Sequence, residues 1–319
     1  MTAAGGAVGG ELGIDAGQTA TRAVLGDGRG GRPASAGGVR RMQGDATAGD
    51  VAAVLLEAID RVGPLPRPGP PTGLGLSGFE AATESQLREI AERLRAAGAG
   101  PLAIAGDGLT ALLGALGDRP GAVVAAGTGA VALARDGSRF ARVDGWGALL
   151  GDAGSGFAIG RAGLSSALRH ADGRGGSDAL LEAATGRFGA IERLPAAIYG
   201  APSPSRAVAD FAADVAAIAQ AGDAMAVAIL DDAGHELAVS AAAALDRLFE
   251  PGAPAAVSYS GNVFRAGPAL TDPFERALAE LRPEAELMPP AGDALAGARL
   301  LARLAPALAP VPGVLWRSA

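Results

Sequence analysis

The sequence has no cysteine, two histidines and few aromatic residues, which make up 4% of its 319 positions. Without cysteine, the chain has no disulfides, no thiolate zinc site, no iron–sulfur cluster with cysteine ligands and no cysteine nucleophile. His170 and His235 lie far apart in the sequence without a neighbouring His and carboxylate at metal-ligand spacing. A histidine-based metal site is therefore not expected, and we predict both side chains at the surface.

Charge and long apolar runs are also scarce. Charged residues make up 19% of the chain, the net charge is −7, and no cluster of basic residues occurs. Because phosphate neutralisation needs a basic patch, nucleic acid is not an expected partner. Residues 1–10 lack a basic segment followed by an apolar one, and no run of 18 apolar residues is present, so we predict a cytoplasmic protein without a membrane partner.

The abundant residues are hydrophobic residues and glycine. Hydrophobic residues reach 49%, and 50 glycines accompany them, so a packed core is expected rather than disorder. Strand–turn–strand patterns at 11–25 and 122–133 alternate with helical periodicity, which is typical of α/β units. We expect long helices at 205–221 and 225–248, the second interrupted near Gly234, and a final helix at 293–304. The length and the repeated hairpin favour two related domains.

Two turns that contain glycine and threonine are candidates for phosphate binding. In the first, Asp15 and Gly17 precede Thr19; in the second, Gly127-Thr128-Gly129 joins two apolar strands. Glycine lets the backbone approach a phosphate, a threonine hydroxyl can donate to it, and Asp15 could hold a metal through water. Either turn alone is more typical of an ordinary hairpin. Two of them in separate halves favour a clamp on a nucleotide phosphate tail, and hence phosphoryl transfer.

Asp107 stands between these turns, after the apolar strand expected at 101–105 and before a helical segment. A carboxylate at a strand end can accept the proton of an attacking hydroxyl, as a general base does. It can equally cap the helix that follows. Position alone supports the two roles equally.

The segment 144–156 places five glycines around Trp146 and Asp152. Such a composition suits neither helix nor strand, so it predicts backbone fitted around a ligand, with Trp146 as a wall and Asp152 accepting hydroxyls. A surface Ω-loop anchored by Trp146 is the less favoured interpretation.

In this order, the segments 13–19, 127–129, 145–156 and 260–264 resemble the N-acetylglucosamine kinase and BadF/BadG/BcrA/BcrD-type ATPase family over nearly the whole chain. The Trp-Gly-x-x-x-Gly-Asp-x-Gly-Ser pattern at 146–155 is the most specific element. The family belongs to the actin, hexokinase and Hsp70 superfamily. The resemblance therefore implies an α/β fold of two ribonuclease-H-like (actin-like ATPase) domains flanking a nucleotide and sugar cleft, with ATP and Mg²⁺ as cofactors. We place the domains at 1–118 and 119–319, the terminal helix being able to pack back on the first.

The resemblance also implies roles for individual residues. On the nucleotide side, the first phosphate motif is Asp15, Gly17, Gln18 and Thr19, and Asp15 also positions the metal. The second phosphate motif is Gly127, Thr128 and Gly129. The adenosine motif is Gly261 and Asn262, and Ala209 makes an adenine-side contact. The sugar side consists of the catalytic Asp107 together with Ala130, Val131, Gly145, Trp146, Gly147 and Asp152.

Several positions depart from the family pattern. Gln18 stands where glycine is usual, Ala20 where Lys, Arg or Ser is common, and Ala130 where serine is common; an asparagine that would bind substrate has no counterpart in 37–42. Since iron–sulfur activators of the same family need cysteine, that branch is excluded. The implied function is an ATP-dependent carbohydrate kinase that phosphorylates N-acetylglucosamine or glucosamine at the 6-hydroxyl, with Asp107 as general base.

Two alternatives stay open. One is an ATPase of the same family that drives a partner protein. The other is a non-catalytic sugar- or nucleotide-binding regulator, which is less favoured because no DNA-binding segment precedes the first strand. The alanine-rich segment 241–244 predicts close packing, within the chain or at the interface of a homodimer.

Overall fold

The computed structural model describes residues 10–18, 20–26, 31–39 and 47–318, so the predicted phosphate-site residue Thr19 lies outside the described residues. The chain divides into two compact units. Unit 1 consists of Met1–Arg119 and Pro290–Ala319, and unit 2 is Pro120–Pro289. The division after Arg119 lies one residue from the boundary expected from the sequence. The segment from Pro290 belongs to unit 1, because its helix α11 (Ala294–Leu304) packs on strands of that unit.

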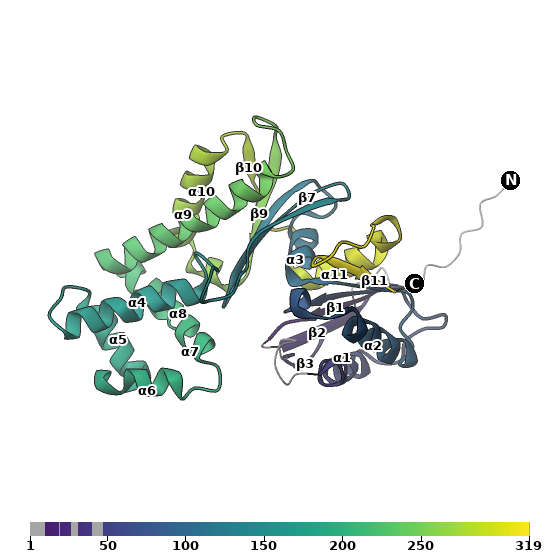
Figure 1. Cartoon of the computed structure of the whole chain (residues 1–319), viewed down its shortest axis with the longest axis horizontal. Coiled ribbons are helices and arrows are strands. Elements are labelled where there is room, and N and C mark those ends of the chain that lie inside the picture. Colours follow the sequence, from purple (N-terminus) through teal and green to yellow (C-terminus); the bar gives the residue numbers. More distant parts are fainter. Residues whose placement is uncertain (1–9, 19, 27–30, 40–46, 319) are drawn as a thin grey trace. The chain divides into compact units, whose positions relative to one another are not determined.

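Unit 1 is built on a sheet with the strand order β11-β5-β4-β1-β2-β3. Figure 1 labels β11, β1, β2 and β3 of this sheet. Strands β1, β4 and β5 run parallel, whereas β2, β3 and β11 are antiparallel to their neighbours. The strands are β1 (Leu12–Ala16), β2 (Ala20–Leu25), β3 (Ala34–Gly37), β4 (Thr72–Leu76), β5 (Leu102–Gly106) and β11 (Leu315–Arg317). The helices are α1 (Ala48–Val62), α2 (Glu84–Ala96), α3 (Asp107–Leu116) and α11.

Alternation along the central strands decides what covers each face of this sheet. Leu12 and Ile14 point to one face and are fully buried in the core that includes residues of α1 and α2. Gly13 and Gly73 point to the other face, where an added Cβ would lie 2.5 Å from the Arg299 side chain and 2.0 Å from the Ala298 carbonyl oxygen. These glycines therefore let α11 lie directly against the strands.

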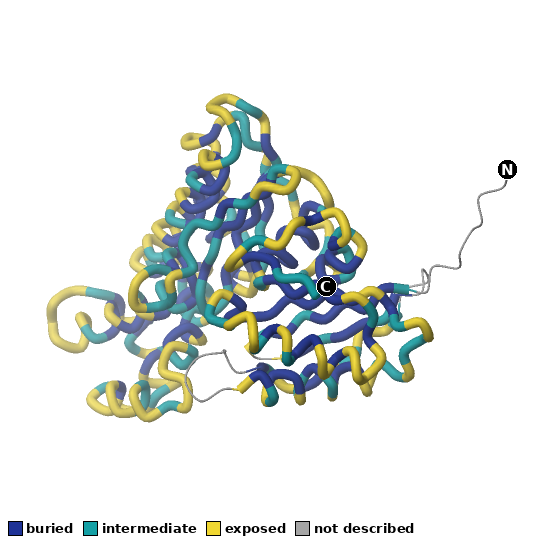
Figure 2. Tube along the Cα trace, turned by 45° about the vertical axis from the view of Figure 1, so that its right-hand side comes forward, coloured by how far each residue is buried: buried dark blue, intermediate teal, exposed yellow. Residues whose placement is uncertain are grey.

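Unit 2 is built on a sheet with the order β10-β9-β6-β7-β8, on which α9 packs. The strands are β6 (Gly121–Ala126), β7 (Ala130–Asp136), β8 (Arg139–Asp144), β9 (Ala255–Ser260) and β10 (Ala285–Leu287). The helices are α4 (Gly156–Ala171), α5 (Asp178–Phe188), α6 (Leu194–Tyr199), α7 (Pro204–Asp210), α8 (Ala212–Gln220), α9 (Ala224–Asp246) and α10 (Pro268–Leu281). In each unit the central strands are largely buried and the helices keep an exposed outer side (Figure 2).

Two helix predictions were wrong. The helix expected at 205–221 is two helices, α7 and α8, which meet at the fully buried Phe211. The break expected near Gly234 is absent from α9, which the structure describes throughout. An added Cβ at Gly234 would lie 2.9 Å from the Leu270 carbonyl oxygen of α10. This glycine permits close helix packing and does not interrupt the helix.

The alanine-rich part of α9 is packed within the chain, since Ala241 and Ala244 are fully buried in the core of unit 2. In the part of the chain that the structure describes, none of the helices by itself has both the length and the apolar composition that a membrane span requires. The segments Pro204–Gln220 and Ala224–Asp246 reach that length and composition only as a pair, with a bend of 119° between them.

Candidate functional site

In unit 1, predicted residues gather where the parallel strands end. Ala16, Leu76 and Gly106, the last residues of β1, β4 and β5, lie side by side in register. The Ser77 N–H donates to the Ala16 carbonyl oxygen at 3.0 Å, and the Gln18 side-chain amide reaches the Ser77 hydroxyl at 3.5 Å. The carboxyl edge of parallel strands is where open α/β sheets bind ligands. Gln18 is therefore held at this edge by a residue that we did not predict, Ser77.

Asp107 follows β5 at the same edge. It is the first residue of α3, and Gly106 is the N-cap, so the helix-capping role considered for Asp107 was wrong. The residue is exposed to solvent. Because Asp107 lies in the first turn of the helix, the helix dipole stabilises its negative charge.

Asp15, the predicted metal-positioning residue, is part of an ion-pair network. Its Oδ2 accepts from Arg22 Nη2 at 2.7 Å, and Nη1 of the same guanidinium donates to Asp293 Oδ2 at 2.6 Å. Asp293 is also the N-cap of α11, accepting from the Ala296 N–H at 3.0 Å. Burial raises the pKa of the Asp15 carboxyl, and the hydrogen bond and charge of Arg22 offset only part of that rise.

In unit 2, the turn between β6 and β7 is held by the start of α4. The Gly127 N–H donates to the Gly129 carbonyl oxygen at 2.8 Å, which closes the turn. The Gly156 N–H donates to the Gly127 carbonyl oxygen at 2.8 Å, and the Phe157 N–H to the Thr128 carbonyl oxygen at 3.1 Å. The turn is thus a rigid element, fastened at each of its residues.

The predicted sugar loop touches this turn directly. An added Cβ at Gly129 would lie 2.4 Å from Asp152 Oδ2, so only glycine leaves room for that carboxylate. The other oxygen, Asp152 Oδ1, accepts from the Gly147 N–H at 3.1 Å. An added Cβ at Gly145 would lie 3.0 Å from the Val131 side chain, so the start of the loop also lies against β7.

The residues predicted on the adenosine side reach the same turn. An added Cβ at Gly261, whose φ is +104°, would lie 2.1 Å from the carbonyl oxygen of Ala126, the residue before the turn. Asn262 follows and is exposed. The Ala209 side chain would lie 3.6 Å from a Cβ added at Gly156, beside the amide that holds the turn. The predicted residues of unit 2 therefore form one cluster, although they are spread over most of its sequence.

The tip of the loop is apolar and exposed. Trp146 has 73% of its surface exposed, Leu149 93% and Leu150 85%. The Arg142 guanidinium lies 5.8 Å from the centre of the Trp146 ring and donates to the Gly145 carbonyl oxygen at 2.5 Å. A loop held at its base thus presents three apolar side chains to solvent.

Four contributors were missed from the sequence: Ser77, Arg22, Asp293 and Asp144. Asp144 accepts from two backbone amides of the sugar loop. For Arg22 a signal was present, because a residue seven positions after Asp15 across a tight hairpin faces it in the adjacent strand. For Ser77 and Asp293 no local pattern indicates the partner.

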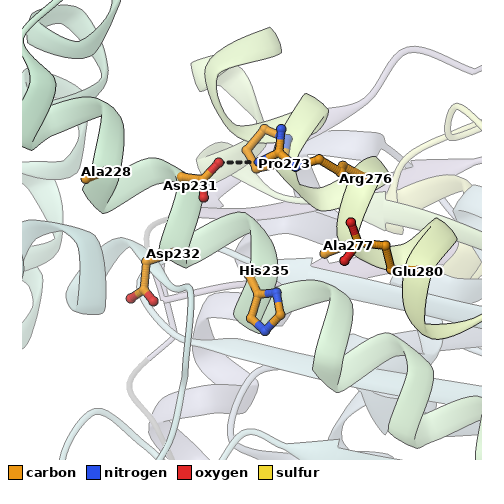
Figure 3. Close-up of a pocket in the computed structure, with 8 residues that line it drawn as sticks. All are labelled: Ala228, Asp231, Asp232, His235, Pro273, Arg276, Ala277 and Glu280. Atoms are coloured by element: carbon orange, nitrogen blue, oxygen red, sulfur yellow. Dashed lines mark hydrogen bonds and ion pairs between the residues drawn. The ribbon is translucent and has the colours of Figure 1, made fainter.

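A pocket of about 270 Å³ lies between α9 and α10, away from the predicted residues (Figure 3). Asp231 of α9 pairs with Arg276 of α10 at its rim, and His235 lines it. His170 and His235 are both exposed, as predicted. Among the residues that the structure describes, no group of three or more His, Cys, Asp or Glu is arranged to hold a metal ion.

The two sheets, each covered by helices, and the hairpin turns at β1–β2 and β6–β7 define an α/β protein of the actin-like ATPase class. The chain belongs to the BadF/BadG/BcrA/BcrD ATPase family, whose model matches residues 12–298. The fold class and the family resemblance predicted from the sequence are both confirmed.

Several proteins similar to this chain are described as sugar kinases. The N-acetylmuramic acid/N-acetylglucosamine kinase of Clostridium acetobutylicum is 27% identical over 234 residues, which cover 72% of this chain and 76% of the relative. The crystal structure of a proposed N-acetylglucosamine kinase from Chromobacterium violaceum matches with a TM-score of 0.70 and 28% identity, covering 93% of this chain and all of that one. A ROK family glucokinase from Streptomyces griseus shares the fold at 18% identity, with a TM-score of 0.59 and coverage of 93% and 99%.

Proposed function

We propose that this protein is an ATP-dependent kinase that transfers a phosphoryl group to the 6-hydroxyl of an amino sugar, N-acetylglucosamine or glucosamine. The enzyme class, a carbohydrate kinase, is that of the curated relative and of the matched structures. The observation that carries the proposal is the contact between Asp152 and Gly129. It joins a loop suited to sugar hydroxyls to a turn suited to phosphates, which are the two groups that a sugar kinase must bring together.

Asp107 is the proposed general base. Its carboxylate accepts the proton of the sugar hydroxyl while the hydroxyl oxygen forms a bond to the γ-phosphorus and the bond from that phosphorus to the β-phosphate oxygen breaks. ADP then leaves with the electron pair of the broken bond. The exposed position of Asp107 at the end of β5 supports this role, because the carboxylate is accessible to a hydroxyl group.

Asp15 is the proposed partner of Mg²⁺. Its partly buried carboxylate near the end of β1 fits a cation that arrives with nucleotide phosphates, since Mg²⁺ keeps several waters and uses only one or two protein carboxylates. The ion would neutralise phosphate charge when bound. Arg22 limits the charge that Asp15 presents, and Gly17 and Gln18 provide the backbone next to it.

The turn and the loop of unit 2 have separate proposed tasks. The turn Gly127–Gly129 and the segment Gly261–Asn262 bind the nucleotide, with Ala209 on the adenine side. Ala130, Val131, Gly145, Trp146, Gly147 and Asp152 bind the sugar. Asp152 is buried and accepts from the Gly147 N–H, which supports its assignment, because a carboxylate held in place can accept hydrogen bonds from sugar hydroxyls with little loss of entropy on binding.

The test is ADP release from Mg²⁺-ATP with glucosamine, N-acetylglucosamine, N-acetylmannosamine, N-acetylmuramic acid, glucose and no sugar. Release with N-acetylglucosamine or glucosamine is the expected result. Phosphorus NMR of the product then distinguishes a 6-phosphate from other phosphate esters. Release that is independent of sugar would support an ATPase that drives a partner, and binding without any release would support a regulator.

Asp107→Asn tests the proposed base. We expect the turnover number to fall by about 10²-fold or more, because the amide cannot accept the proton, with ATP affinity within about twofold of wild type. Asp118→Asn, just beyond the other end of α3, is the matched control and should leave turnover unchanged. Normal turnover of Asp107→Asn, measured beside calorimetric ATP binding, would remove Asp107 from the mechanism.

A further inference from the structure

The base of the sugar loop is built from two aspartates in an unusual backbone conformation. Asp144 and Asp152 both have a φ of +60°, and they are the non-glycine residues with positive φ in the described part of the chain. This left-handed region is unfavourable for residues with a Cβ, although aspartate tolerates it better than most. Strain of this kind persists only where surrounding contacts hold it, and it is concentrated at functional sites.

Asp144 supplies those contacts. Its Oδ1 accepts from the Asp152 N–H at 2.7 Å, and its Oδ2 accepts from the Ala153 N–H at 2.8 Å. Both oxygens of one carboxylate thus hold two consecutive amides, at distances typical of charge-assisted hydrogen bonds. An added Cβ at Gly151 would lie 2.3 Å from Asp144 Oδ1, so the loop is closely fitted around this side chain.

The hydrogen bonds continue from Asp144 to the predicted sugar ligands. Asp152, whose amide Asp144 holds, accepts from the Gly147 N–H through Oδ1 and faces Gly129 through Oδ2. Asp144 itself is paired with Val131 across the β7–β8 ladder, so its backbone is fixed by the sheet. The carboxylate of Asp144 therefore links a rigid strand to the loop that carries Asp152.

The exposed tip of the loop shows why the hydrogen bonds of Asp144 at its base are needed. A loop that carries Trp146, Leu149 and Leu150 largely exposed to solvent would gain free energy by burying them if its base were loose. Hydrogen bonds at the base oppose that collapse and keep the loop in one conformation before substrate arrives. Binding then costs less conformational entropy.

We propose that Asp144 is a positioning residue of the sugar site, which clamps the Asp152 and Ala153 amides and so presets Asp152 and the loop for the substrate. This inference rests on the proposed function, which assigns the loop to sugar binding. Asp144 does not contact the reacting atoms and acts through Asp152.

Asp144→Gly is the decisive variant. Glycine adopts a φ of +60° without steric cost, so the backbone can keep its path while the carboxylate is lost. We expect the KM for the sugar to rise about tenfold or more, with the KM for ATP within about twofold. Asp144→Asn, which keeps one acceptor oxygen and tolerates positive φ, should recover part of the affinity. Asp136→Asn, on the neighbouring strand β7, is the control and should leave both KM values unchanged.

Hydrogen exchange of the Asp152 and Ala153 amides gives a readout that is independent of activity. In wild type both amides should be protected by Asp144, and in Asp144→Gly they should exchange about tenfold faster or more. An unchanged sugar KM, or unchanged exchange of both amides, would overturn the inference, as would a loss of Tm without any change in KM. If wild type turns over none of the sugars, the proposed function fails, whereas exchange still decides whether Asp144 clamps the loop.

Discussion

Arg22→Ala removes the cation that lies between Asp15 and Asp293. The Asp15 side chain is 16% exposed, so its bond to Arg22 at 2.7 Å belongs with hydrogen bonds to charged groups in a buried setting, at about 1.5–3 kcal/mol. The Asp293 side chain is 54% exposed, so its pair adds about 0.2–1 kcal/mol. We expect the free energy of unfolding of unit 1 to fall by about 2–4 kcal/mol, which corresponds to about 5–15 °C in Tm for a unit of this size.

The pKa of Asp15 gives this prediction a pH dependence. Burial raises the pKa in the folded state, so the protonated carboxyl favours folding and the ionised one opposes it. Without Arg22 nothing offsets that cost. The penalty of Arg22→Ala should therefore be full near neutral pH and should shrink as the pH falls through the raised pKa of Asp15.

Trp316 provides the assay, since it is half-buried against the core of unit 1. Its fluorescence in a Trp146→Phe background follows the unfolding of that unit in urea. Arg22→Lys should recover part of the loss, because a single ammonium cannot match the two-pronged guanidinium that bridges both acids. Asp15→Asn combined with Arg22→Ala should be more stable than Arg22→Ala alone, since no unpaired charge is left buried. A loss below about 0.5 kcal/mol for Arg22→Ala, or no gain in the double variant, would refute the reasoning.

Two further predictions concern stability. Gly297→Ala should lower Tm strongly, because the added Cβ would lie 1.8 Å from the Thr110 carbonyl oxygen of α3. Gly186→Ala in α5, where the added Cβ meets open space, should instead raise stability by about 0.5–1 kcal/mol. Equal effects of the two substitutions in thermal melts would contradict this account. Asp223→Ala should cost about 1–2 kcal/mol in urea unfolding, because Asp223 caps α9 and accepts from the N-cap of α5, Ser177, at 2.7 Å. Burial raises the pKa of Asp223, but hydrogen bonds from Ala226 and Ser177 outweigh it and lower that pKa. The stabilisation by Asp223 should therefore persist to acidic pH and be lost only as the pH falls through the lowered pKa. A cost of Asp223→Ala that is independent of pH down to acid unfolding would contradict this prediction.

Local sequence signals located correctly the strands and the turn that carry several of the predicted site residues. The strand expected at 101–105 is β5, and Asp107 follows it directly. The turn at Gly127–Gly129 lies between two strands, as the apolar runs on either side predicted. Such features depend on neighbours in the chain, where alternation, turn residues and helical periodicity act.

The sequence was less informative where the atom that excludes a Cβ at a glycine belongs to a residue distant in the sequence. Gly234 in α9 was interpreted as a break, but it is a contact point for α10. Gly129 was predicted to let a phosphate approach, and the structure adds a reason that the sequence does not show, since an added Cβ would lie 2.4 Å from Asp152 Oδ2. A glycine signals that a Cβ is not tolerated, and only the folded chain shows which atom excludes it.

The sequence by itself determined the α/β pattern, the two hairpin turns, the family and the elements on which most predicted site residues lie, because each of these depends on short contiguous motifs. Tertiary structure alone decided which groups meet. Arg22 and Asp293 are 271 positions apart, yet they bond because α11 returns to lie on β1 and β4. The hydrogen bonds from the Asp152 and Ala153 amides to Asp144 likewise form only when the end of β8 and the loop that follows are both in place. Hydrogen bonds depend on distances that no local sequence pattern specifies.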